Sequence, residues 1–110
     1  MDNVIHKGLA EGRWQKFDLC FQLANIGSEV SRTLNAIKKN NSLSAEKAFE
    51  RALDLIDLTI EAKPRYSALK EICRFREIFC KAYIEKDINE LEYLDNYTMQ
   101  FAIAWQLKKS

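Results

Sequence analysis

The stretch from Ala45 to Lys63 constrains the fold of this chain most strongly, because its apolar side chains recur at steps of three and four residues. This spacing places them on one side of an α-helix. The apolar face comprises Phe49, Ala52, Leu53, Ile56 and Ile60, widened by Ala48, Leu55, Thr59 and Ala62. Such a broad face is stable only when it is buried, so we expect this helix to pack against other helices.

The opposite side of the same helix is acidic. Its carboxylates follow one another at steps of four, four, three and four residues, and they are Glu46, Glu50, Asp54, Asp57 and Glu61. Residues at this spacing form one continuous row, here named the acidic ridge. The ridge is the main functional question that the sequence raises, because such carboxylates either pair with cationic side chains or bind a cation.

The composition predicts a single helical domain over residues 1–110. A folded domain of 110 residues buries about 65% of the surface that its unfolded chain exposes. Hydrophobic residues make up 47% and charged residues 30%, with three glycines and one proline, which favours an all-α protein. The net charge of +1 gives no overall field that would attract nucleic acid or an anionic membrane.

The three cysteines, Cys20, Cys73 and Cys80, form no Cys-x-x-Cys motif of the kind found in metal and redox sites. Cys73 and Cys80 would lie roughly 10 Å apart along one helix, too far for a disulfide. We therefore expect three free thiols that are at least partly buried, in a reducing compartment. The N-terminal residues lack the apolar core of a signal peptide, and no apolar run approaches the ~20 residues that span a bilayer. These features predict a soluble, cytoplasmic protein.

Four helices joined by short connections are predicted after a loose lead-in at residues 1–12. The first is expected from Arg13 or Trp14 to about Lys39, and the second from 45 to 63 with Ser42 or Ser44 as its cap. The third is expected to begin between Pro64 and Ala68, with Pro64 in its first turn or Ser67 as its cap, and to end at about Glu85. The fourth is expected to run from the region 87–92 to about residue 109. Amphipathic helices with such short connections predict an antiparallel four-helix bundle in up-down-up-down order.

Polar residues of the first predicted helix form a narrow stripe of Asp18, Gln22, Asn25, Glu29 and Arg32. Apolar side chains cover the rest of its circumference, which is wider than one face of a bundle requires. We therefore expect part of this surface to meet a second subunit in a homo-oligomer. Gly27 predicts the close approach of another backbone, since glycine inside a helix costs about 1 kcal/mol relative to alanine.

Arg76 lies at the edge of the apolar face of the third predicted helix, where its donors need carboxylate or carbonyl acceptors. Because the second and third helices are expected to be antiparallel, the part of the ridge opposite Arg76 contains Asp54 and Asp57. Arg74 and Arg51 are further candidate partners of the ridge. Partial burial of the pair predicts that Arg76→Ala destabilises the fold by more than about 2 kcal/mol.

The segments LANIGSEVSRTL, AFERALDLIDLTI and LKEICRFREIFC resemble blocks shared by a group of small, uncharacterised bacterial and archaeal proteins. The similarity covers nearly the whole chain from Trp14 to Trp105. It implies a helical bundle and no particular activity. The resemblance directs attention to the charged residues of these blocks, which are Glu29, Arg32, Glu50, Arg51, Asp54, Asp57, Arg74 and Arg76.

A magnesium-dependent enzyme is one alternative. Glu50, Asp54 and Asp57 project from one helix face. Together with Glu29 from the first helix, they are comparable to the carboxylates of all-helical nucleoside triphosphate pyrophosphohydrolases, although the chain lacks the paired glutamates of that family. Di-iron, zinc, triad and glycine-rich phosphate sites need histidine or glycine partners that the sequence does not supply, since His6 is its one histidine.

A nucleic-acid-binding helical protein is a second alternative, because Tyr66 lies near the basic residues Arg65, Lys70, Arg74 and Lys81. Glutamates interrupt this strip, which favours a mixed solvated surface.

We expect instead a non-enzymatic interaction module that self-associates and presents a charged helix face to a protein partner, without a cofactor, nucleic acid or membrane. The candidate charged cluster, functional or structural, consists of Glu29, Arg32, Glu50, Asp54, Asp57, Arg74 and Arg76.

Overall fold

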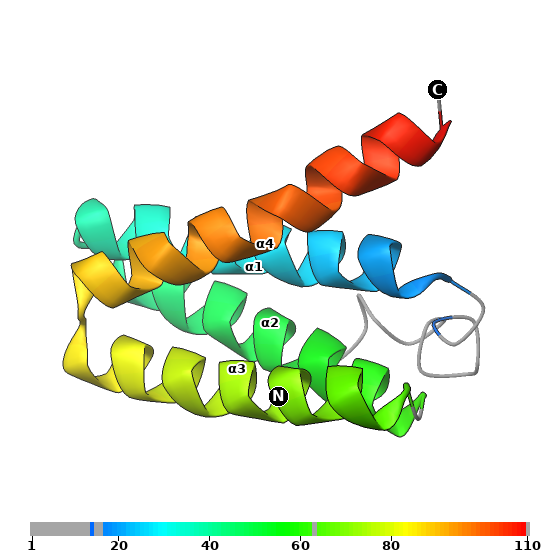
Figure 1. Cartoon of the computed structure of the whole chain (residues 1–110). Coiled ribbons are helices and arrows are strands. Elements are labelled where there is room, and N and C mark those ends of the chain that lie inside the picture. The colour runs from blue at the N-terminus through cyan, green and yellow to red at the C-terminus, as the bar shows by residue number, and fades with distance from the viewer. Residues whose placement is uncertain (1–13, 15–16, 63, 110) are drawn as a thin grey trace.

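The computed structural model describes residue 14 and residues 17–62 and 64–109, without the side chains of residues 105, 108 and 109. The described residues form four helices, α1 (Leu19–Lys38), α2 (Ser42–Glu61), α3 (Tyr66–Glu85) and α4 (Ile88–Lys109), and no strand (Figure 1). The prediction of an all-α four-helix bundle is confirmed. The predicted lead-in at residues 1–12 lies outside the described part of the chain.

The central element of the bundle is α1. Figure 1 shows each helix running back alongside the one before it. α1 packs extensively against both α2 and α4, whereas α3 makes fewer contacts with its neighbours α2 and α4. The C-terminal half of α4 leads away from α3 (Figure 1). The bundle is therefore closely packed between α1 and α2 and open between α3 and α4.

α1 begins later than predicted, at Leu19 instead of near Trp14. Asp18 is extended, with φ −72° and ψ 163°, and its carboxylate accepts a hydrogen bond from the backbone N–H of Phe21 at 2.9 Å. Aspartate is a favourable N-cap, so it sets the first turn of the helix. Trp14 belongs to a separate turn, in which its carbonyl accepts from the N–H of Phe17 at 3.1 Å.

The cap of α2 is Asn41, so the prediction of Ser42 or Ser44 was wrong. The Asn41 side chain accepts a hydrogen bond from the N–H of Ser44 at 3.1 Å. The preceding Asn40 adopts the left-handed conformation, with φ 56°. Asparagine tolerates this conformation better than most residues.

α3 begins within the predicted interval, but Pro64 lies before its first turn and Ser67 does not provide its cap. Arg65 occupies the N-cap position, and its side chain makes no capping hydrogen bond. At the start of α4, the carboxylate of Asp87 accepts a hydrogen bond from the N–H of Glu90 at 3.1 Å. This bond is one half of a capping box, with Glu90 three residues after Asp87.

The core lies where the four helices face one another, with Ile26, Val30, Ile56, Phe79 and Leu91 among its fully buried residues. The broad apolar face predicted for the second helix is buried along most of its length. Both α2 and α4 cover α1. The wide apolar circumference of α1, which predicted contact with a second subunit, is therefore used within the chain.

Gly27 lies in the contact between α1 and α4, next to Thr98. A Cβ atom added there would lie 2.6 Å from Oγ1 and 2.7 Å from Cβ of Thr98. Real Cβ contacts are essentially never that short, so only glycine fits this position in the observed packing. The predicted close approach of another helix is confirmed.

The cysteines are free, as predicted, but they differ in exposure. Cys20 and Cys80 are half-buried, whereas Cys73 is exposed, so the prediction that all three are partly buried was wrong for Cys73. The buried face of α3 is narrow and contains Ile72 and Phe79, which leaves Cys73 beside it in solvent. No helix among the described residues combines the length and the hydropathy that a membrane-spanning segment needs.

Candidate functional site

Glu29 on α1 is a buried carboxylate held between two arginines, with 7% of the residue exposed. Its Oε1 accepts a hydrogen bond from Nε of Arg51 on α2 at 3.1 Å, and its Oε2 accepts one from Nη1 of Arg32 at 3.0 Å. The side chain of Arg51 is 27% exposed and that of Arg32 61%. Because a buried carboxylate is costly without a partner, the bond to Arg51 ties α1 to α2.

The sequence offered Arg51 as a partner of the acidic ridge, and this prediction was wrong. Arg51 lies beside the buried Ala48 and Ala52, on the side of α2 that faces α1. Arg51 therefore binds Glu29 on α1 and no carboxylate of the ridge among the described residues. The polar stripe predicted for the first helix is accordingly divided, since Gln22 and Glu29 are buried.

The predicted contact between Arg76 and the acidic ridge is confirmed at Asp57. Nε of Arg76 donates to Oδ1 of Asp57 at 2.8 Å and Nη2 donates to Oδ2 at 3.3 Å, so the guanidinium binds the carboxylate with both arms. The hydrogen bond from Asp57 raises the pKa of Arg76. The two side chains are 37% and 50% exposed. Solvent screens such a pair, so the contribution we expect falls from more than about 2 to about 1 kcal/mol or less.

The other charged candidates do not converge on one centre. Arg74 is exposed and forms no ion pair with any described residue, while Glu50 and Asp54 are half-buried on α2. In the described part of the chain, no group of three His, Cys, Asp or Glu side chains is placed to hold a metal ion. Two of the four carboxylates considered for a magnesium site, Glu29 and Asp57, instead form separate contacts with arginines.

Trp14 anchors the start of α1 to α2, a feature that the sequence did not predict. Its indole Nε1 donates a hydrogen bond to Oγ1 of Thr59 at 2.9 Å, and its carbonyl accepts one from Nε2 of Gln22 at 2.8 Å. All three residues are buried. Thr59 gave little signal for this contact, because its buried hydroxyl already donates to the carbonyl of Leu55 at 2.8 Å within α2.

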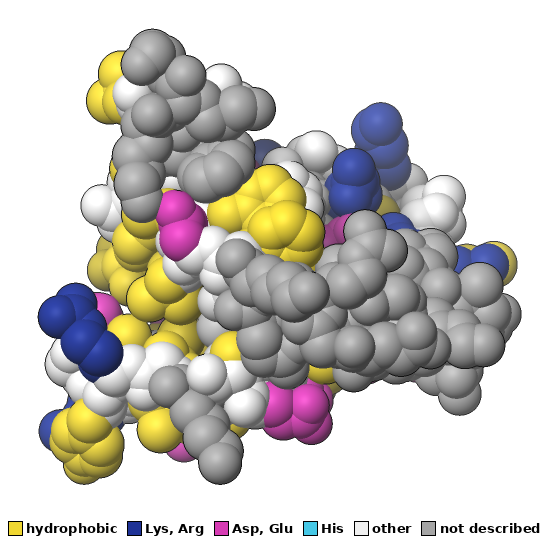
Figure 2. Space-filling model, turned by 90° about the vertical axis from the view of Figure 1, so that its right-hand side faces the viewer, with side chains coloured by type: hydrophobic (Ala, Val, Ile, Leu, Met, Phe, Trp, Pro, Cys, Tyr) yellow, Lys and Arg dark blue, Asp and Glu magenta, His cyan; other side chains and the backbone are white. Residues whose placement is uncertain are grey.

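An apolar hollow of about 230 Å³ opens between α1, α3 and α4. Leu23, Ile72 and Phe101 are among the residues that line it. At its polar edge, the hydroxyl of Tyr97 donates to the carboxylate of Glu71 at 3.5 Å, and burial together with this carboxylate raises the pKa of Tyr97. Figure 2 shows hydrophobic side chains exposed between the end of α4 at the top and the start of α3 at the lower left.

The C-terminal half of α4 also exposes apolar side chains that do not line this hollow. From Asn96 to Leu107 the chain contains no charged residue. Met99 is 50% exposed, Ile103 56% and Leu107 71%. The half-helix therefore presents an apolar surface that the described part of the bundle leaves uncovered.

Comparisons of the chain with protein-family models, with curated proteins and with solved structures gave no match.

Proposed function

We propose that this protein is a non-enzymatic helical interaction module that self-associates through the C-terminal half of α4 and presents a charged helix face to a protein partner. The observation that carries this proposal is the uncharged run from Asn96 to Leu107, with three large apolar side chains at least half exposed. Soluble monomers rarely leave large apolar patches uncovered, and such patches typically form contacts with other proteins.

The hollow between α3 and α4 is a separate apolar surface. It is lined largely by apolar side chains, and α4 contributes Tyr97, Thr98 and Phe101 to it, on the side of the helix opposite to the exposed Met99, Ile103 and Leu107. A second copy related by a two-fold axis would place the exposed side of its own α4 against the same side of the first α4, and each copy would then bury the other's apolar residues. Contacts of this self-complementary kind are the commonest route to closed oligomers.

The charged face of the proposed module is the acidic ridge on α2. Glu46, Asp57 and Glu61 of the ridge are exposed, and Arg76 binds Asp57. The other two exposed carboxylates are available to a basic protein partner, which would gain orientation and association rate from them. The free thiols support a reducing compartment such as the cytoplasm as its location.

The proposal is non-enzymatic because Glu29 and Asp57, which the magnesium-enzyme alternative requires as ligands, are hydrogen-bonded to guanidinium groups. Magnesium would have to displace arginines from both carboxylates. We therefore expect magnesium to leave the melting temperature unchanged. A rise that Asp54→Ala abolishes would favour the enzyme.

Sedimentation velocity tests self-association. The full chain is expected to sediment as a dimer or larger species at tens of micromolar, because an obligate apolar contact is populated by mass action. The double variant Ile103→Glu with Leu107→Glu should sediment as a monomer, since it places charges on the proposed contact. Ile84→Glu is the matched control, because Ile84 is 75% exposed on α3. A monomeric wild-type chain at every concentration would remove the basis of the proposal.

A further inference from the structure

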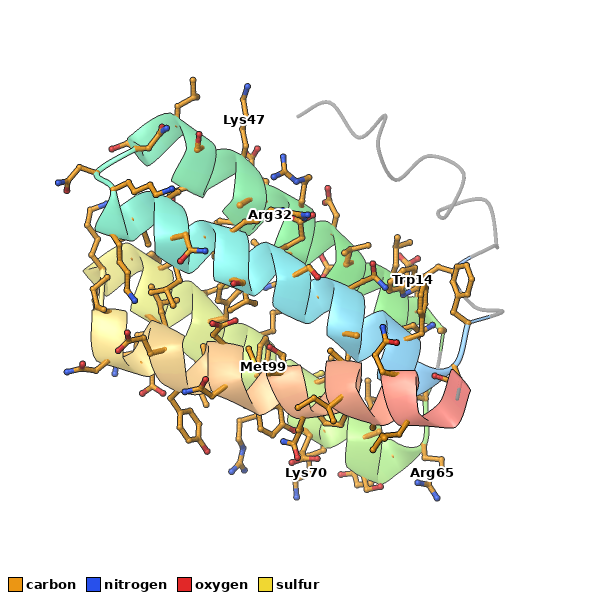
Figure 3. The ribbon with its side chains drawn as sticks, turned by 90° about the horizontal axis from the view of Figure 1, so that it is seen from above. Trp14, Arg32, Lys47, Arg65, Lys70 and Met99 are labelled. Carbon is orange, nitrogen blue, oxygen red and sulfur yellow. The ribbon has the colours of Figure 1, made fainter. Side chains whose placement is uncertain are left out.

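A second hollow lies on the other side of the molecule, between the C-terminal part of α1 and the N-terminal part of α2. It is an open cleft of about 360 Å³, and three cationic residues line it: Arg32, Lys39 and Arg51. Figure 3 shows Arg32 between the α1 and α2 ribbons and Lys47 pointing away from them. This cleft shares no lining residue with the hollow between α3 and α4, so a ligand bound in it would not depend on self-association.

The cleft carries an excess of positive charge. Its three cations are opposed by the carboxylate of Glu29, which leaves a local balance of 3 − 1 = +2. Lys39 forms no ion pair within the described residues. The cleft is therefore suited to an anion of more than one charge.

Hydrogen-bond donors remain available on both arginines. Glu29 occupies Nε of Arg51 and Nη1 of Arg32. A guanidinium has five N–H donors, so each arginine keeps N–H groups that bind no other described residue. The planar arrangement of these donors matches the oxygens of a phosphate group, often with two parallel hydrogen bonds.

Glu29 gives these donors a fixed position. Its carboxylate is only 10% exposed and binds one guanidinium from each helix, so both groups are held at the same wall of the cleft. Pre-positioned donors lose less conformational entropy when they bind an anion than free side chains do. Asn41 already caps the first turn of α2, and the end of that helix is not needed for the site.

We propose that this cleft binds the phosphate group of a small phosphorylated molecule, with Arg32, Arg51 and Lys39 as its ligands and Glu29 as the positioning residue. The volume of about 360 Å³ lies at the lower end of the range of roughly 300 to 1,000 Å³ for small-molecule sites. It accommodates a phosphate and a small organic group. Protein–phosphate binding of this kind needs no reaction and no metal.

Calorimetric titration of the full chain with inorganic phosphate and with pyrophosphate tests the proposal, at an ionic strength held constant with chloride. Both probes should bind saturably, pyrophosphate more tightly because it carries more charge. Arg32→Gln removes an exposed donor group and should weaken pyrophosphate binding about tenfold. Lys47→Gln is the matched control, because Lys47 is an exposed cation of α2 that does not line the cleft. It should leave the affinity unchanged.

Three results would overturn the proposal. The first is a heat of titration with phosphate or pyrophosphate that does not exceed the heat of titration with chloride. The second is an equal loss of affinity in Arg32→Gln and Lys47→Gln, which would indicate binding to diffuse surface charge. The third is binding of a single-stranded RNA oligonucleotide that pyrophosphate does not displace, which assigns the cleft to a polymer. Glu29→Gln tests the positioning role separately. It raises the local charge to +3 yet should weaken binding, and tighter binding would contradict the role given to Glu29.

Discussion

The α1–α2 half of the molecule and the α3–α4 half differ in how their apolar helices are buried. Between α1 and α2, polar groups are buried together with their partners, as in the bonds of Trp14 to Thr59 and of Glu29 to Arg51. Between α3 and α4, the helices diverge and an apolar hollow stays open. Buried polar partners thus fix the first pair of helices. Among the described side chains, the second pair is joined by the exposed bond of Tyr97 to Glu71, and apolar surface stays open there.

The largest effect expected from this comparison is at Trp14. Trp14→Ala removes a fully buried indole and its hydrogen bond to Thr59, whose hydroxyl still donates to the carbonyl of Leu55. The lost packing should lower the free energy of unfolding by about 3 to 5 kcal/mol. Phe101→Ala, at the wall of the open hollow, should cost about 1 kcal/mol, because this ring is only half-buried. Urea denaturation of both variants measures the contrast. Equal losses would show that the two halves are equally well packed.

The next effect is at Arg51. Arg51→Ala leaves the buried carboxylate of Glu29 with only the exposed Arg32 as partner. We expect the free energy of unfolding to fall by about 2 to 3 kcal/mol, somewhat less than the loss of a fully buried pair, since one bond remains. Denaturant titration is again the measurement, and a loss below about 0.5 kcal/mol would show that Glu29 does not need this bond.

Arg76→Ala, in the α2–α3 contact, should have a smaller effect than Arg51→Ala. Its partner Asp57 is half exposed, so water solvates the carboxylate when the arginine is removed. The expected loss is about 1 kcal/mol or less, and it should shrink at high salt. If Arg76→Ala lowered the free energy of unfolding as much as Arg51→Ala does, the exposed fractions of Arg76 and Asp57 would not account for the strength of their ion pair.

The smallest effect expected is at Asp95 on α4, where burial raises the pKa of the carboxyl while Ser31 and Lys38 oppose the shift. A raised pKa means that the folded state holds the proton more tightly than the unfolded state, so this contribution to stability is lost as pH rises through the folded pKa. Asp95→Asn should therefore stabilise the protein at pH 7 by roughly 0.5 kcal/mol. The gain should vanish at about pH 3, below the ordinary value of 3.8 for this group. Thermal melts of both proteins across this pH range give the comparison, and a gain that persists at low pH would contradict it.

The sequence predicted the parts of the fold that depend on periodicity. The close approach at Gly27 was predicted from the cost of glycine inside a helix, although its partner, Thr98 of the non-consecutive α4, was not. The apolar spacing in α2 and the contact of Arg76 with Asp57 follow from helical geometry and from the antiparallel order of consecutive helices. They were accordingly predictable from one chain.

The predictions that failed depend on how helices rotate about their axes. Arg51 was a candidate partner of the ridge, but it lies on the side of α2 that faces α1 and binds Glu29. Cys73 was placed in the core, but the buried face of α3 proved too narrow to include it. The wide apolar surface of α1 also suggested contact with a second subunit. The structure covers α1 on two sides, by α2 and α4, and the homo-oligomer stays a prediction. Side-chain periodicity alone does not determine how many neighbours a helix has.

Amide hydrogen exchange measured at low and at high protein concentration tests the central claim most directly, because it reports on each half of the molecule in the same sample. If the open half is the contact between copies, protection of residues 96–107 should rise with concentration. The buried amides of α1 and α2 should show the same protection at both concentrations. Protection of residues 96–107 that is independent of concentration would contradict the account.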